Sequence, residues 1–439
     1  MSRTAVLISA MVAAASALTW TNTGDLEDAL IVRDLSMGPG GRLYAAASTD
    51  TASGAGAATV FYSSDFSDWQ SVGPMPGVQV ITTLVKSDGD TLFAATRANG
   101  SGSLYFSADG LDWTYRSSPG TVRFGNTMTC LVQDAGGRLL AGSNFMGMSA
   151  AEVYYSDNRG MTWARPATMP NNADQGFLFR AADGSIFCGT VFSAARVMKT
   201  TDRGANWAYS SPVGNPKPAM TQSVGGRLYV ASRSGSTGAI DISTDGGANW
   251  TTSYTGGSVR SLYRASDGFI YAGLDSVAPD TAEVIVSTND GATWVSAGRL
   301  GGARRIYRLV DVDSSGTHFL YAATGPNGDV LRAPLGPVGV AEPLRTPRQF
   351  AFDGGYPNPF SGRTTIRYAL LADCRVNLRV CDATGSCVRV LADAHQRAGS
   401  YRILWDGTDT KCRNLPVGVY FCRMVAGGQR LERKVVLTR

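Results

Sequence analysis

Carboxylates are the side chains of this sequence that could take part in catalysis, and glutamate is scarce among them. Of the 35 acidic residues in the 439-residue chain, only five are glutamate. Glu152 and Glu283 each precede a short apolar run that predicts a strand, and Tyr154 follows Glu152 by two residues. A glycoside hydrolase needs two carboxylates flanking the bond that it cleaves. The 30 aspartates could supply such a pair, but most of them fall in turns.

Other kinds of active site find little support. The two histidines, His318 and His395, stand alone, so a Ser/His/Asp or Cys/His arrangement lacks its base. No pair among the seven cysteines has the spacing of a zinc site. We therefore expect neither a metal nor a cofactor. The longest basic run is Arg304-Arg305, so we expect no nucleic-acid partner. No apolar run reaches the roughly 18–20 residues of a transmembrane span.

The composition indicates the kind of elements that must position any site. Glycine accounts for 52 residues, and charged residues make up only 17%. Abundant glycine with few charges is typical of short strands joined by tight turns, and it disfavours a helical bundle. We therefore predict an all-β protein.

Tryptophan recurs at a nearly constant spacing. From Trp69 onward the intervals are 44, 50, 44, 43 and 44 residues, and each Trp ends a segment of the form S/T-x-D/N-x-G-x-T/N-W. The first two copies are one residue shorter. The short polar side chains can bond the N–H groups of a turn, glycine takes the positive φ that closes it, and Trp begins the next strand. The residues that we expect to build these turns are Ser63, Asp65, Trp69, Ser107, Asp109, Trp113, Ser156, Asn158, Gly160, Trp163, Thr200, Asp202, Gly204, Trp207, Ser243, Asp245, Gly247, Trp250, Ser287, Asn289, Gly291 and Trp294.

Each repeat of about 44 residues holds enough sequence for four strands, which is one blade of a β-propeller. Counting repeats predicts a seven-bladed propeller over residues 18–335. Residues 303–335 supply only three strands of the last blade, around Ile306 to Val312, Phe319 to Ala323 and Val330 to Ala333. We expect Thr19-Trp20-Thr21 to complete that blade and to close the ring, which would remove exposed sheet edges.

The repeated turn resembles the Asp-box (BNR) repeat of the sialidase-like superfamily. The resemblance implies a propeller whose variable loops open on one face. A sialidase uses three arginines, a Tyr–Glu pair and an aspartic acid, and Arg33 stands where its first arginine is expected. The resemblance makes Arg33 and either Glu152 or Glu283 candidate catalytic residues. Arg33 lacks the Ile-Pro that normally follows, and neither glutamate precedes the expected arginine pattern. The loop residues expected to contact a ligand are Arg97, Arg123, Phe124, Asn144, Phe145, Asp174, Phe192, Arg196, Arg233 and Asp275.

The end of the chain has a different character. Residues 336–349 contain three prolines and predict a stiff linker. Residues 350–439 hold six alternating runs that predict a small Ig-like β-sandwich. This region resembles the type A sorting domain of the type IX secretion system, which is similar to the Ig-like domain of flagellar hook-capping proteins. The residues that carry the resemblance are Tyr356, Pro357, Asn358, Pro359, Phe360, Trp405, Asp406, Gly407, Gly418 and Tyr420.

The cysteines and the amino terminus bear on export. Residues 1–17 have the charge, apolar core and small-x-small end of a secretory signal. Five of the seven cysteines crowd into the last 66 residues, where Cys381 and Cys387 flank a Thr384-Gly385 turn and could meet across a hairpin. An oxidising compartment would allow disulfides.

The sequence therefore predicts an exported protein of the outer surface of a Gram-negative-type bacterium. We expect a non-enzymatic propeller that binds a glycan or a surface protein and that uses the type IX secretion machinery. The alternative is a secreted glycoside hydrolase of the exo-sialidase type.

Overall fold

The computed structural model divides the chain into two compact units that meet in sequence between Leu335 and Gly336. Each unit is described by itself. The structure describes residues 18–24, 26, 29–49, 57–98, 102–117, 127–144, 153–168, 175–191, 195–210, 215–276, 281–314, 316–335, 351–356, 358–362, 364–370, 374–396, 399–410 and 413–438. The predicted signal (1–17), the predicted linker (336–349), Glu152 and Pro357 lie outside these residues.

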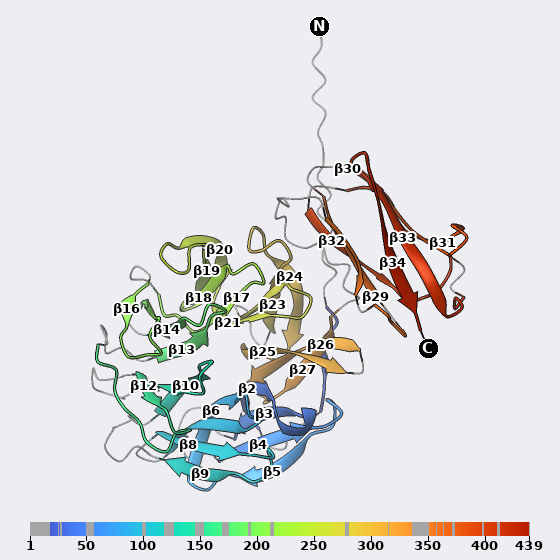
Figure 1. Cartoon of the computed structure of the whole chain (residues 1–439). Coiled ribbons are helices and arrows are strands. Elements are labelled where there is room, and N and C mark those ends of the chain that lie inside the picture. The colour runs from blue at the N-terminus through green and yellow to red at the C-terminus, as the bar shows by residue number, and fades with distance from the viewer. Residues whose placement is uncertain are drawn as a thin grey trace. The chain divides into compact units, whose positions relative to one another are not determined.

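The first unit is a β-propeller (Figure 1). Its described residues form antiparallel sheets around a central channel, and one short 3-10 turn occurs at Pro39–Gly41. The strands are β1 (Thr21–Asn22), β2 (Ile31–Met37), β3 (Leu43–Ser48), β4 (Ala58–Ser63), β5 (Gln70–Pro74), β6 (Val78–Lys86), β7 (Leu92–Ala98), β8 (Gly102–Ser107), β9 (Thr114–Ser117), β10 (Thr127–Gln133), β11 (Leu139–Asn144), β12 (Val153–Ser156), β13 (Gln175–Arg180), β14 (Ile186–Thr190), β15 (Val197–Thr200), β16 (Ala208–Tyr209), β17 (Met220–Gln222), β18 (Leu228–Ser234), β19 (Thr237–Ser243), β20 (Thr251–Gly257), β21 (Val259–Arg264), β22 (Ile270–Leu274), β23 (Thr281–Ser287), β24 (Val295–Gly301), β25 (Arg305–Ser314), β26 (Thr317–Gly325) and β27 (Val330–Pro334).

Within the described part of this unit, five sheets have four strands and one has seven. The seven-stranded sheet joins β6–β9 to β10–β12 through a single residue pair, Thr127 with Arg97. Dividing the sheet at that pair gives seven sheets in the described part of this unit, which equals the number of blades that the repeats predict. That the ring has exactly seven blades stays a prediction.

The ring is closed by β1 (Thr21–Asn22), which shares only Thr21 with the predicted segment. Trp20 lies outside the strand, and its indole N–H donates to Ala297 O of β24 (3.4 Å), so the prediction that Trp20 leads this strand is wrong. Thr21 and Asn22 pair with Arg332 and Leu331, so β1 is the outermost strand of the sheet β1-β27-β26-β25. Thr23 strengthens the join, because its hydroxyl donates to Val330 O (2.8 Å) and accepts from the Trp69 indole (3.0 Å). The predicted closure of the last sheet by the amino-terminal segment is therefore confirmed.

The core of the propeller lies between neighbouring sheets. Apolar residues of one sheet pack on the next, as Tyr44 and Val60 do on Ile81 and Leu84. Tyr229 packs on Leu262 in the same manner further round the ring. These side chains are at most 6% exposed, so burial of apolar surface between blades stabilises the ring.

The predicted turns have the expected hydrogen bonds. In the copy around Thr200, the hydroxyl accepts from Gly204 N (3.1 Å), and Asp202 Oδ1 accepts from Asn206 N (2.9 Å). Gly204 has a φ of +86°, and a Cβ there would lie 2.5 Å from a methyl carbon of Leu140 in β11. Glycine is therefore required twice, by the turn itself and by the close approach of the preceding blade.

The second unit is a small sandwich of two sheets. The sheets are β28-β29-β32 and β31-β30-β33-β34, and Ile366, Val376, Trp405 and Tyr420 lie in the core between them. Its strands are β28 (Ala351–Tyr356), β29 (Thr364–Leu370), β30 (Cys374–Cys381), β31 (Cys387–Gln396), β32 (Gly399–Trp405), β33 (Gly418–Ala426) and β34 (Gln429–Leu437). Six of these match the predicted runs, and β28 was not predicted.

Candidate functional site

Six of the strands that line the channel carry a backbone irregularity at the same level, whereas β17, which also lines it, shows no register shift. In β2 the pairing steps from Val32 to Asp34 and leaves Arg33 without a partner on β3. The same shift leaves out Thr82, Thr129, Gly176, Arg260 and Tyr307 of the strands β6, β10, β13, β21 and β25. A bulge re-aims the side chain of its extra residue.

All of these bulge residues line one cavity of about 640 Å³ in the channel, together with Pro218, which precedes β17 at the equivalent place. The wall is asymmetric. Arg33, Arg260 and Tyr307 supply two cations and an aromatic ring, whereas Thr82, Thr129, Gly176 and Pro218 are small and uncharged. Gly176 cannot be replaced by a larger residue, because a Cβ there would lie 2.4 Å from Lys217 O.

The charged part of the wall belongs to a larger group of arginines. Tyr307 lies at its centre, with the guanidinium carbon of Arg33 5.5 Å and that of Arg260 5.2 Å from its ring centre. Arg305 donates to the Tyr307 hydroxyl (3.4 Å). Arg97 and Arg233, at the ends of β7 and β18, are close enough to act electrostatically on this group. We call Arg33, Arg97, Arg233, Arg260 and Arg305 the arginine cluster.

The electrostatics of the arginine cluster favour an anion. Asp275 forms a two-point ion pair with Arg260, with both N–O distances 2.6 Å. Among the described residues, no carboxylate forms an ion pair with the other four arginines. The Nε atoms of Arg33, Arg97 and Arg233 are buried and have no hydrogen-bond partner there. Buried donors without partners are costly, so a ligand that accepts from them is stabilised.

The pKa values of two guanidiniums reflect this crowding. Burial lowers the pKa of Arg33, the Tyr307 hydroxyl opposes the change, and the charges of Arg97, Arg260 and Arg305 add to the lowering. Burial also lowers the pKa of Arg233, with a further contribution from Arg260 that Asp275 partly offsets. A bound anion would relieve this repulsion.

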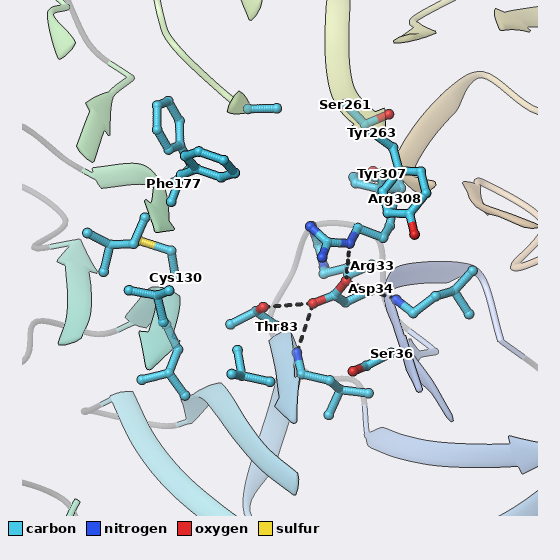
Figure 2. Close-up of a pocket in the computed structure, with 18 of the residues that line it drawn as sticks. Arg33, Asp34, Ser36, Thr83, Cys130, Phe177, Ser261, Tyr263, Tyr307 and Arg308 are labelled. Atoms are coloured by element: carbon cyan, nitrogen blue, oxygen red, sulfur yellow. Dashed lines mark hydrogen bonds and ion pairs between the residues drawn. The ribbon is translucent and has the colours of Figure 1, made fainter. Parts of the chain in front are cut away.

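The residue after the bulge has a different task. Asp34 is buried, and its carboxylate accepts from the Thr83 hydroxyl (2.7 Å) and from Leu84 N (2.8 Å) of β6 (Figure 2). Its other oxygen lies 3.2 Å from Arg308 Nε of β25. Asp34 therefore connects β2 to both neighbouring sheets. Its carboxylate oxygens are occupied by these contacts, so the role of Asp34 is structural.

The structure separates the predicted catalytic residues. Arg33 lines the channel cavity, but Glu283 lies in β23 with its carboxylate 4.0 Å from Arg299, and it is not a lining residue. The carboxylates that line the cavity among the described residues are Asp34 and Asp311. The described channel therefore does not bring a glutamate to Tyr307, as a Tyr–Glu pair requires.

The predicted loop residues also divide. Arg97, Arg233 and Asp275 belong to the arginine cluster or contact it, whereas Arg196 stacks on Tyr209, with 4.3 Å from its guanidinium carbon to the ring centre. Asn144 lies at the end of β11. Those outside the described residues are Arg123, Phe124, Phe145, Asp174 and Phe192.

The sequence analysis missed Arg260, Tyr307 and Arg305, although the chain carries a signal for two of them. Each bulge residue stands two positions before an apolar residue, as in Val32-Arg33-Asp34-Leu35, Val259-Arg260-Ser261-Leu262 and Ile306-Tyr307-Arg308-Leu309. Aligning these segments between repeats would have placed Arg33, Arg260 and Tyr307 at one level.

A second group of polar residues resembles a catalytic triad only in composition. Ser266 Oγ and Asp311 Oδ1 lie 2.9 and 3.1 Å from the same His318 nitrogen, Nδ1. A base needs one nitrogen for the nucleophile and the other for its orienting acid. The described residues contain no cluster of three His, Cys, Asp or Glu side chains suited to a metal ion, and no helix among them is long and apolar enough to span a membrane.

The predicted sorting residues form the core and the turns of the second unit. Asn358 donates to Lys434 O and accepts from Val436 N, both at 2.8 Å, which fixes the segment after β28 to β34. Phe360 and Tyr420 both contact the Trp405 ring, with ring centres 5.3 and 5.5 Å away. Asp406 accepts from the backbone and the hydroxyl of Thr408, Gly407 has a φ of +75°, and Gly418 begins β33.

Comparison with protein families identifies this unit. Residues 355–438 match the family described as secretion system C-terminal sorting domain. The second unit is a secretion-system sorting domain. The protein is therefore exported to the outer cell surface of a Gram-negative bacterium of the Bacteroidetes type. No curated protein matches the sequence.

Solved structures bear on the propeller. PorZ, a bacterial surface component of the type IX secretion system of Porphyromonas gingivalis, aligns over 95% of this chain at 16% identity with a TM-score of 0.52. This chain spans 60% of the PorZ chain. Virginiamycin B lyase from Staphylococcus aureus aligns over 72% of this chain and 99% of its own at 8% identity, with a TM-score of 0.56. YCF48 from Cyanidioschyzon merolae aligns over 72% and 98% at 12% identity, with a TM-score of 0.52. At these identities the similarity shows the fold alone.

Proposed function

We propose that this protein is a non-enzymatic binding protein of the cell surface whose propeller captures an anionic group at the arginine cluster. The group would be a carboxylate or sulfate carried by a glycan or by a surface protein. The observation that carries the proposal is the set of buried Nε donors without partners on Arg33, Arg97 and Arg233.

The asymmetry of the channel wall supports recognition rather than general attraction. Tyr307 holds two guanidiniums against its ring, so that side of the cavity is ordered before a ligand arrives. Preorganised donors lose little conformational freedom on binding. The facing wall of Thr82, Thr129, Gly176 and Pro218 leaves space for the uncharged part of the ligand.

Peptide carboxylates belong among the ligands tested. One solved structure with a similar fold is described as YCF48 bound to D1 peptide, with 14% identity and a TM-score of 0.51. Peptides with free carboxyl ends are therefore included among the ligands tested for this chain.

We also infer that the repeated Trp-terminated turns are Asp-box turns and that the ring has seven blades. The hydrogen bonds of the Thr200–Trp207 copy, repeated at Ser243–Trp250, support the first inference. The equivalent bulges on the innermost strands support the second.

The test is binding of the full-length chain to an array that pairs anionic and neutral ligands. The array carries sialosides, uronic-acid and sulfated polysaccharides with neutral counterparts, and peptides with free or amidated carboxyl ends. We expect binding only to the anionic member of a pair, with weakening as salt increases. Arg33→Ala should lower the affinity about 10-fold or more. Arg299→Ala removes an exposed arginine outside the cavity and should leave binding unchanged.

Two outcomes would overturn the proposal. Equal binding to the neutral members would exclude the arginine cluster as the recognition element. Release of free sugar from the spots would favour the exo-sialidase alternative. Sugar release is measured because Arg33 and Tyr307 are in contact, and a sialidase uses arginine and tyrosine in its active site. Glu152, which lies outside the described residues, would then be the first residue to replace.

A further inference from the structure

The cysteines of this protein differ sharply in their chemical accessibility. Cys130, Cys188, Cys381 and Cys422 are buried within the unit to which each belongs. Burial raises the pKa of Cys130 and of Cys422 to about 12, and it raises the pKa of Cys188 well above its ordinary value. These thiols are not ionised near neutral pH and are poor nucleophiles. Of the six cysteines in the described part of the chain, Cys387 alone is exposed.

Cys387 has a thiol neighbour directly across a hairpin. It is the first residue of β31, and the pairing of β30 with β31 places it opposite Cys381, the last residue of β30. Opposed residues of antiparallel strands have Cα atoms about 4.5–5.5 Å apart. A disulfide requires roughly 4.4–6.8 Å. A pair in this register is therefore of the kind that a disulfide can join. Both thiols are free in the structure, and Cys387 Sγ donates to Arg389 O (3.7 Å), so the bond requires rotation of the Cys387 side chain.

The turn between them holds the two strand ends together. Asp382 N donates to Ser386 O (3.0 Å), and the Asp382 carboxylate accepts from Thr384 N (2.9 Å) and from Ser386 N (3.0 Å). Cys422 is a less suitable partner for Cys381, because it lies opposite Val380 and packs in the core of the sandwich. The register therefore selects one pair.

We propose that Cys381 and Cys387 form a disulfide bond once the protein has left the cytoplasm, as a covalent clasp on the β30–β31 hairpin of the sorting domain. The co-reactant is an oxidised dithiol protein of the oxidising compartment through which the chain is exported. The Cys387 thiolate attacks its disulfide and releases one thiolate. The Cys381 thiolate then attacks Cys387 Sγ and releases the second thiolate. Two electrons pass to the oxidant, and two protons leave the hairpin.

The second step depends on proximity, because the Cys381 thiol is buried. Burial raises the pKa of the Cys381 thiol, and the charges of Arg423 and Arg379 offset only part of that rise. The hairpin register holds Cys381 opposite Cys387, so the attack is intramolecular and needs only a small fraction of thiolate. The clasp also meets a structural need. The β30–β31 pairing shifts register twice, between Leu378 and Arg379 and between Val380 and Cys381, and β31 is an edge strand. Irregular edge pairing is prone to slippage, and a covalent tie fixes one register.

The test uses the full chain recovered from the surface or medium of a secreting cell. Free thiols are alkylated under denaturing conditions without reductant, and the protein is digested with trypsin. Cleavage after Arg379 and Arg389 releases residues 380–389, which contain both cysteines and no internal Lys or Arg. We expect this peptide to be unalkylated and lighter than its dithiol form by two hydrogen atoms. A peptide with both cysteines alkylated, or one of them linked to another peptide, would refute the clasp.

Thermal unfolding gives a second readout with a matched control. Reductant should lower the midpoint of the sorting-domain transition of the native chain by roughly 5–15 °C. The Cys387→Ser variant should unfold at the lower midpoint with or without reductant. Cys374→Ser, which alters a half-buried thiol at the other end of β30, should keep the full reductant response. An identical response to reductant in the native chain and in Cys387→Ser would overturn the proposal.

Discussion

The rim and the channel of the propeller repeat two backbone devices, and their side chains behave in opposite ways. We use rim for the six Trp-terminated turns, from Ser63–Trp69 to Ser287–Trp294. They carry nearly the same Ser or Thr, Asp or Asn, Gly and Trp, although the first copy has Phe66 in place of glycine, with a φ of +65°. At the channel, successive bulges carry Arg33, Thr82, Thr129, Gly176, Arg260 and Tyr307. The turn and the bulge both repeat because the blades have a similar backbone. The side chains of the turns are nearly constant, whereas the side chains of the bulges differ from blade to blade.

This contrast separates residues that build the ring from residues available to a ligand. At the rim the constant side chains bond their own turn and contact the preceding blade, so a change there acts on stability. At the channel the bulge residue is left out of the strand pairing. In β2 the next residue, Asp34, makes the contact between blades, whereas in β6 the bulge residue Thr82 itself donates to Met128 O of the next blade (2.5 Å). Arg33 and Asp34 are adjacent in sequence, but Arg33 is available to a ligand, whereas Asp34 builds the ring.

The largest expected effect is the loss of stability on replacing Asp34, the structural residue that follows Arg33 directly in the sequence. Asp34→Ala should destabilise the propeller by about 3–4 kcal/mol, because it leaves Leu84 N and Thr83 without their acceptor and removes the ion pair to Arg308. Chemical denaturation of the full chain measures the change. Ser36→Ala is the matched control, since the Ser36 hydroxyl lines the same cavity but bonds only Met37 O next to it. Equal midpoints for the two variants would contradict the division.

The rim is tested by a pair of glycines with the same backbone conformation. Gly204 and Gly184 both have a φ of +86°, but a Cβ at 204 would meet Leu140 at 2.5 Å, whereas nothing lies within 4 Å of one at 184. Gly204→Ala should cost about 2–3 kcal/mol and Gly184→Ala about 1 kcal/mol. The difference measures the contact between blades. Equal losses in thermal or denaturant unfolding would show that the turn alone requires glycine.

Sequence reasoning succeeded where a local pattern of residues determines the structure. The turns, the closure by the segment near Trp20 and six strands of the sorting domain follow from local residue patterns. β28 was missed because Asp353, Gly354 and Gly355 weaken its strand pattern, and pairing with β29 overrides that weakness.

The arginine cluster was only partly predictable for a different physical reason. Arg33 and Arg260 lie on strands far apart in sequence, and only closure of the ring brings both beside Tyr307. A bulge is a register shift of the backbone, so the alternation of apolar residues alone does not say which side chain enters the channel.

The third expected effect is on ligand affinity, and it compares the wall of the channel at Tyr307 with the facing wall at Thr129. Tyr307→Ala removes the ring on which the Arg33 and Arg260 guanidiniums rest, so affinity for the anionic ligand found on the array should fall about 5- to 30-fold. Thr129→Ala changes the facing wall at the same level and should alter affinity less than about threefold. Titration calorimetry at fixed salt compares them. A greater loss for Thr129→Ala would assign recognition to the opposite wall.

The smallest effect concerns an acid in one of the rim turns. Hydrogen bonds from the backbone and side chain of Asn206 lower the pKa of Asp202 to about 2. Because this folded-state pKa lies below the unfolded value near 4, the stabilisation is present above pH 4 and is lost as the pH falls through about 2. Asp202→Asn keeps an acceptor that does not titrate, as Asn158 does naturally in another copy. The variant lacks the second oxygen, to which Asn206 Nδ2 donates (2.8 Å), so it should be less stable than the native chain near pH 7 by about 1 kcal/mol.

Unfolding midpoints measured between pH 4 and pH 2 decide this prediction. The native midpoint should fall more steeply than that of Asp202→Asn, and Asp68→Asn is the control. Asp68 lies in the shorter Ser63–Trp69 turn, where its backbone N–H donates to Asp65 and its own carboxylate accepts none of the turn's hydrogen bonds described here. Parallel pH profiles for all three proteins would mean that the rim carboxylates act only as hydrogen-bond acceptors, which an amide replaces at every pH. The rim would then depend on the shape of its turns and not on their charge, in sharper contrast to the charged wall of the channel.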